Sequence, residues 1–65
     1  MTEEQYHEYI KNLELVCEMS RITLAYKHLF NPEVVRKAEE TLRKTEAQIE
    51  SLKRTYAKYE KPTQA

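Results

Sequence analysis

The 65-residue chain contains no glycine, and Pro32 is the only residue before position 62 that is expected to interrupt a helix. Helix-favouring residues (Glu, Lys, Arg, Leu and Ala) are frequent on both sides of it. Asn31 is of the preferred N-cap type, and proline fits the first helical position because its missing N–H has no partner there. The residue before a proline avoids helical backbone angles. The chain is therefore predicted to be all-α, with two helices separated at Pro32.

The expected helices have matched lengths. Thr2 and Gln5 have the spacing of a capping box, which predicts that the first helix begins at about Glu3. The predicted segments are a helix over about 3–30, a turn at 30–32, a helix over about 32–59 and a disordered tail at 62–65. Two such helices with so short a connector fold back on each other, so residues 1–61 are predicted to form a coiled-coil-like, antiparallel two-helix hairpin.

A heptad pattern runs along the second helix without a break. Its apolar or small positions alternate at spacings of three and four residues: Val35, Ala38, Leu42, Thr45, Ile49, Leu52, Tyr56 and Tyr59. The first helix carries a line that we call the inner seam: Tyr6, Ile10, Leu13, Cys17, Ser20 and Leu24. In a hairpin that reverses at Asn31, each inner-seam residue faces a member of the second pattern, such as Tyr6 opposite Tyr56. We therefore expect these two lines to form the core.

A second apolar line on the first helix has no counterpart in the chain. This outer stripe consists of Leu15, Met19, Ile22, Tyr26 and Leu29. At about 100° per residue it lies nearly opposite the inner seam. A helix that is apolar on two faces is expected to be buried on two faces. The outer stripe is therefore predicted to be a protein-interaction surface, which either pairs two hairpins into a homodimeric four-helix bundle or binds a helix of another protein.

Composition argues against several functional classes. Eleven Lys and Arg balance eleven acidic residues, so the basic excess of a nucleic-acid or membrane-surface binder is missing. No apolar run approaches the roughly 20 residues that cross a bilayer. A single cysteine, Cys17, favours a reducing compartment. We therefore expect a cytoplasmic protein without membrane association.

The sequence offers no pattern of catalytic, cofactor-binding or metal-ligating residues. His7 is interpreted as a surface side chain and His28 as a partner of helix-end carbonyls. Cys17 falls in the inner seam, where it is expected to act as a small buried hydrophobe. We expect no enzymatic activity, cofactor or metal. The predicted function is that of a small interaction protein: an adaptor, a chaperone-like subunit or an inhibitor of a protein partner.

A nucleic-acid-binding regulator is the alternative. Residues 1–31 hold three Lys and Arg against five Glu, net −2, and residues 32–65 hold eight against six, net +2. Four cations follow the outer line of the second helix and are candidate phosphate contacts: Arg36, Arg43, Arg54 and Lys61. Because Glu40 and Glu50 interrupt the same face, nucleic acid is not the expected partner.

A second alternative comes from the residues around the turn. The segment 29–35, Leu-Phe-Asn-Pro-Glu-Val-Val, followed by Ala38 and Glu39, resembles the turn of the small helical-hairpin aspartyl-phosphate phosphatases that regulate sporulation. The resemblance implies a helical hairpin, with an essential Asp in a following Ser-Gln-x-Leu-Asp segment. Here Ala38 stands at the Ser position and Leu42 at the Asp position, which describes a degenerate relative without that activity. The layout is also similar to that of small two-helix type III secretion co-chaperones.

Overall fold

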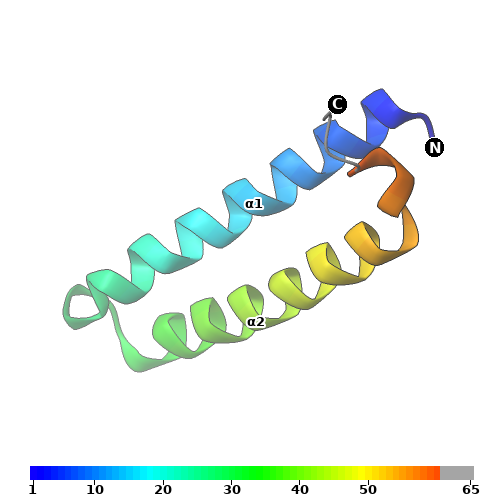
Figure 1. Cartoon of the computed structure of the whole chain (residues 1–65). Helices are drawn as coiled ribbons and strands as arrows, with labels where there is room; N and C mark the ends of the chain where they lie inside the picture. Colours follow the sequence, from blue (N-terminus) through cyan, green and yellow to red (C-terminus); the bar gives the residue numbers. More distant parts are fainter. Residues whose placement is uncertain (61–65) are drawn as a thin grey trace.

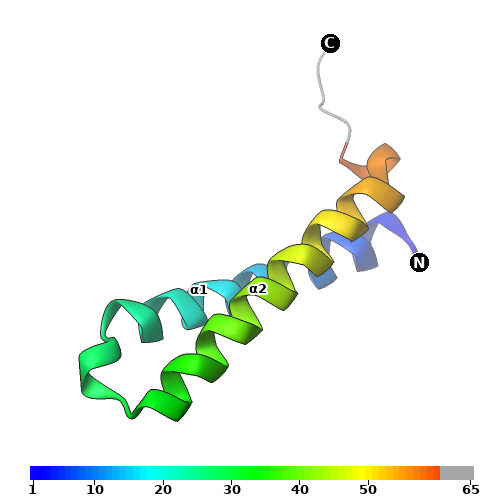
Figure 2. The same cartoon turned by 90° about the horizontal axis from the view of Figure 1, so that it is seen from below.

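The computed structural model describes residues 1–60 as a hairpin of two α-helices (Figure 1). The elements are α1 (Glu3–Ala25), the 3₁₀ turn η1 (Lys27–Leu29), α2 (Pro32–Thr55) and the 3₁₀ turn η2 (Ala57–Tyr59). The helices run antiparallel, so the start of α1 and the end of α2 lie at one end of the hairpin. The helix axes are inclined to each other, and the two helices cross in the view of Figure 2. The predicted all-α antiparallel hairpin is confirmed, while the tail predicted at 62–65 lies outside the described residues.

Both helices begin where local side chains satisfy the first free backbone N–H groups. The Gln5 backbone N–H donates to Thr2 Oγ1 at 3.1 Å, and the Thr2 N–H donates to Gln5 Oε1 at 3.0 Å. At the second helix, the Val34 N–H donates to Asn31 Oδ1 at 3.0 Å, with Pro32 in the first turn. These are the caps predicted from the sequence, and each determines the residue at which its helix begins.

The α-helices end earlier than the predicted ends near 30 and 59. Tyr26 and Tyr56 leave the helical region with φ, ψ of −112°, 35° and −110°, 45°, and a single 3₁₀ turn follows each. Many helices end on a glycine with positive φ. This chain has no glycine, and residues 1–60 contain no non-glycine residue with positive φ. The helix therefore tightens into a 3₁₀ turn, and Phe30 and Asn31 are extended before α2 begins.

The core is a single contact line between the helices. On α1 the inner seam supplies the fully buried side chains Tyr6, Ile10, Cys17 and Ser20, while Leu13 and Leu24 are half-buried. On α2 and η2, the eight predicted heptad positions are all buried or half-buried, and every other residue of these elements is exposed. The heptad pattern thus identified the face of α2 that packs on α1.

The helices also pair in the predicted register. The Tyr6 and Tyr56 rings lie 5.4 Å apart between centroids, as expected for facing residues. Two polar contacts bracket this register: Arg21 Nη2 lies 3.0 Å from Glu46 Oε2, and Gln48 Nε2 donates to Tyr9 Oη at 2.8 Å. Relative to the α2 position that faces Arg21, Glu46 is displaced toward the open end. Relative to the position that faces Tyr9, Gln48 is displaced toward the turn. The two displacements cancel, so together the contacts agree with a reversal centred on Asn31.

Candidate functional site

The outer stripe lies in solvent along one face of α1. Its exposed fractions are 55% for Leu15, 61% for Met19, 56% for Ile22, 53% for Tyr26 and 68% for Leu29. The first three lie on α1, Tyr26 caps its C-terminus and Leu29 lies in η1, so the stripe follows the helix into the turn. Five large apolar side chains in one line form a contiguous exposed patch, and such patches mark interaction sites.

Three further exposed apolar residues were not assigned from the sequence: Val16 in the middle of α1, and Phe30 and Val34 on either side of the turn. Val16 lies between the two heptad lines of α1, so a heptad count gives it no place. Phe30 and Val34 flank the reversal, where helical periodicity is broken. The only sequence signal for them is their apolar character within the turn half of the hairpin.

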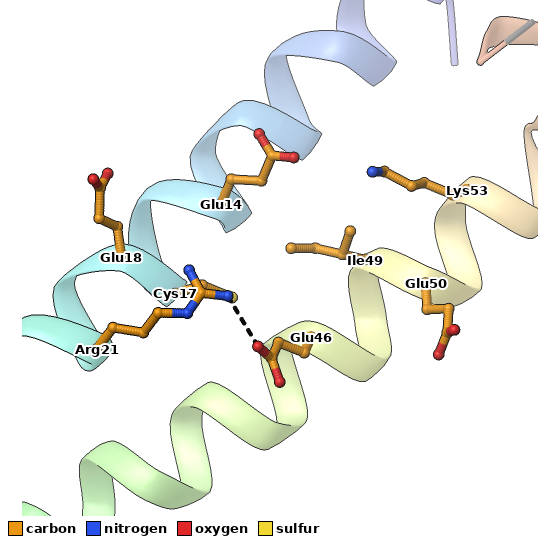
Figure 3. A pocket seen from close by; sticks show the side chains of 8 residues that line it. All are labelled: Glu14, Cys17, Glu18, Arg21, Glu46, Ile49, Glu50 and Lys53. Atoms are coloured by element: carbon orange, nitrogen blue, oxygen red, sulfur yellow. Dashed lines mark hydrogen bonds and ion pairs between the residues drawn. The ribbon is translucent and has the colours of Figure 1, made fainter. Parts of the chain in front are cut away.

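One flank of the hairpin carries a charged cleft of about 690 Å³ (Figure 3). Arg21 reaches across it from α1 to Glu46 on α2, and both side chains are about half exposed. An exposed pair of this kind contributes roughly 0–1 kcal/mol to stability. Glu14, Glu18, Cys17, Ile49, Glu50 and Lys53 complete the lining. The Cys17 thiol is buried, as predicted, so this flank presents charge rather than a reactive nucleophile.

The remaining titratable side chains among residues 1–60 do not gather into a metal-binding group. In the part of the chain that the structure describes, no group of three or more His, Cys, Asp or Glu side chains is placed to hold a metal ion. His7 Nε2 lies 3.7 Å from Glu3 Oε2 on the exposed first turns of α1. His28 lies exposed in η1, beyond the end of α1.

The cations predicted to contact phosphate are exposed on the outer side of α2. Arg36 Nη2 lies 3.9 Å from Glu33 Oε2, while Arg43 and Arg54 are exposed farther along the helix. Lys61 lies outside the described residues. On the same outer side Lys44 Nζ lies 3.6 Å from Glu40 Oε2, so acidic side chains interleave with the cations and the face is not a continuous basic stripe.

The two positions that matter for the phosphatase resemblance both lie in the contact line between the helices. Ala38 and Leu42 are half-buried members of the α2 heptad. The position that corresponds to the family's essential Asp therefore holds an apolar side chain that packs on α1.

Three tyrosines, Tyr6, Tyr56 and Tyr59, pack on one another at the open end. The Tyr6 ring is fully buried, with centroids 5.4 Å from Tyr56 and 5.5 Å from Tyr59, and Tyr56 stacks on Tyr59. Tyr59 Oη donates to the Met1 carbonyl at 3.2 Å. The cluster thus ties η2 back to the start of the chain. These contacts indicate a packing role for three of the five tyrosines.

The Tyr6 hydroxyl is buried without a hydrogen-bond partner of standard geometry among residues 1–60. Burial, together with the nearby Glu60 carboxylate, which disfavours a second negative charge, raises the pKa of Tyr6 to about 12. Tyr6 is therefore held neutral, which suits a structural side chain and not a proton donor near neutral pH.

Comparison with known proteins gives no relative. No model of a known family matches the chain, and neither a curated protein nor a solved structure matches it. Within residues 1–60, neither helix combines the length and the apolar character that a membrane crossing requires. The function has to be inferred from the surfaces of the hairpin itself.

Proposed function

We propose that the chain is a small, non-enzymatic interaction protein that binds protein through the outer stripe. A second copy of the hairpin is its first partner, and the pair forms a homodimeric four-helix bundle. The single observation that carries this proposal is the exposure of Leu15, Met19, Ile22, Tyr26 and Leu29, each more than half accessible along α1 and the turn that follows it. An adaptor, a chaperone-like subunit or an inhibitor would all use such a face.

The apolar area of two outer stripes is large enough to support a symmetric pair. Burying a large apolar side chain completely is worth roughly 1.5–3 kcal/mol. Because the five side chains are only a little more than half exposed, covering one stripe yields about 4–9 kcal/mol. Association costs about 4–15 kcal/mol. One stripe alone barely offsets that cost, whereas a dimer covers two stripes and roughly doubles the gain.

The outer stripe is tested by placing a charge in its centre. Ile22→Asp is expected to give a helical monomer, because the carboxylate must lose its water when the stripe is covered. Ala47→Asp is the matched control, since Ala47 is exposed on the outer side of α2 and its variant stays in water. Sedimentation equilibrium with circular dichroism on both variants decides the matter. An Ile22→Asp protein that assembles like the wild type would rule out the outer stripe as the interface.

A further inference from the structure

The outer stripe continues into a groove between the two helices, on one flank of the hairpin. The groove holds about 360 Å³ and is walled by Val16, Met19 and Thr23 from α1 and by Val34 and Thr41 from α2. Met19 belongs to both the stripe and the groove, so the two surfaces are continuous. Small side chains, Ser20 and Ala38 among them, line the same hollow.

The opposite flank is the charged cleft around Arg21 and Glu46. A partner that covered the stripe from that flank would have to desolvate the carboxylates of Glu14 and Glu50, at a cost that uncharged side chains do not impose. On the groove flank it meets mainly apolar and hydroxyl side chains. The difference between the flanks therefore gives the partner a preferred side.

Building on the proposed homodimer, the geometry points to a reciprocal interface in which the outer-stripe side chains of each copy fill the groove of the other. One surface carries both halves of the fit: a ridge of large side chains on α1, and beside it a hollow with Ser20 and Ala38 among the residues that line it. Ridges that pack into grooves are the general mode of helix packing. A two-fold symmetric dimer requires a self-complementary surface of this kind.

The exposed apolar area matches what one subunit contributes to a stable interface. The stripe together with Val16, Phe30 and Val34 comprises eight large side chains, between 38% and 68% exposed. If each counts for about 150 Å², the lower end of the range for aromatic side chains, this amounts to on the order of 600 Å². Each partner in a standard protein interface buries about 800 Å². A second copy supplies the same area and so completes the requirement.

Charge supports the same arrangement. The half of the chain that contains α1 has three Lys and Arg against five Glu, net −2, and the half that contains α2 has eight against six, net +2. Seating α1 of one copy in the groove beside α2 of the other brings these opposite charges together. Lys37 stands on the groove wall, and Glu8 and Glu18 border Leu15 on the ridge.

Thr41→Arg tests the groove, because Thr41 lines it while remaining exposed in the single hairpin. Ala47→Arg is the matched control: it introduces the same side chain and charge on an exposed outer position of the same helix. We expect Thr41→Arg to raise the dimer dissociation constant at least about tenfold, with unchanged helix content, and Ala47→Arg to stay close to wild type. Val34→Lys, at the exposed wall near the turn, is the second variant and has the same expected loss.

The outcomes separate the groove from the stripe. If Thr41→Arg and Val34→Lys dimerise like the wild type while Ile22→Asp is monomeric, the groove proposal is overturned and the outer stripe remains the interface. If the wild type is monomeric at every concentration, the groove proposal and the homodimer fall together. Loss of dimerisation in both groove variants, with Ala47→Arg unaffected, supports the reciprocal interface.

Discussion

The two apolar lines on α1 have the same heptad spacing and opposite environments. The inner seam, represented by Tyr6, Ile10 and Cys17, is buried against α2, whereas Met19 and Ile22 of the outer stripe lie more than half in solvent. Spacing alone therefore does not determine burial. A hairpin contains one other helix, and that helix can cover only one of the two lines. The difference assigns stability to the inner seam and leaves the outer stripe free for the association that we propose, on separate residues of one helix.

The largest effect should come from a charge in the inner seam. Ile10→Asp places a carboxylate without a partner among buried side chains of the only core the hairpin has, so we expect the chain to unfold. Circular dichroism at 222 nm measures the loss of helix. Ile22→Asp, the same change in the outer stripe, should keep its helix signal at concentrations where it is monomeric. If Ile10→Asp melted at the same temperature as the wild type, the inner seam would not be the buried line that distinguishes it from the outer stripe.

Two leucines two positions apart make the comparison quantitative. Leu13→Ala removes a half-buried inner-seam side chain and should lower the free energy of unfolding by about 2 kcal/mol or more. Leu15→Ala, in the outer stripe, should change it by no more than about 0.5 kcal/mol in the dilute monomer. Urea unfolding at low protein concentration measures both values. Equal costs for the two variants would contradict the division between seam and stripe.

The inner seam should also respond to alkaline pH through Tyr6. Its pKa is raised to about 12 in the folded hairpin, above the ordinary value of 10.0. The neutral phenol is therefore favoured by folding, and its contribution to stability is fully present below pH 10 and lost as the pH rises toward 12. Thermal melts across this range, followed alongside tyrosinate absorbance, should show that decline. Tyr6→Phe should lose this component of the decline, because it has no phenol to ionise. An identical alkaline profile for wild type and Tyr6→Phe would exclude Tyr6 as its source.

The smallest effect is expected on the outer side of α2, away from both lines. Replacing Arg36, Arg43 and Arg54 together with Gln should leave assembly unchanged and shift stability by about 0.5 kcal/mol or less, because these side chains stay in water. Fluorescence anisotropy with labelled RNA and duplex DNA at low salt completes the test. Wild-type binding that weakens with salt and disappears in the triple variant would favour the nucleic-acid-binding alternative.

The features that follow from neighbouring residues or from heptad spacing could be predicted, the register of the two helices included, and those that depend on the separation and crossing of the helices could not. The caps at Thr2 and Asn31 require only neighbouring residues, and the α2 heptad requires only its own spacing. The α-helical end at Ala25 was missed because the length of backbone needed to reverse direction without glycine is set by the separation of the two helices, and the end at Thr55 was missed because no proline or glycine marks it. The groove walled by Val16 and Thr41 was missed for a related reason. Its walls come from both helices, and their crossing decides which flank opens.

The central claim is that a second copy covers the outer stripe. Sedimentation equilibrium of the wild-type chain from low micromolar to near-millimolar concentration tests it most directly, with thermal melts on the same samples. We predict a mass that rises from 7.8 kDa toward twice that value and a melting temperature that rises with concentration, since folding and association are linked. A single 7.8 kDa species with a constant melting temperature over the whole range would contradict the account.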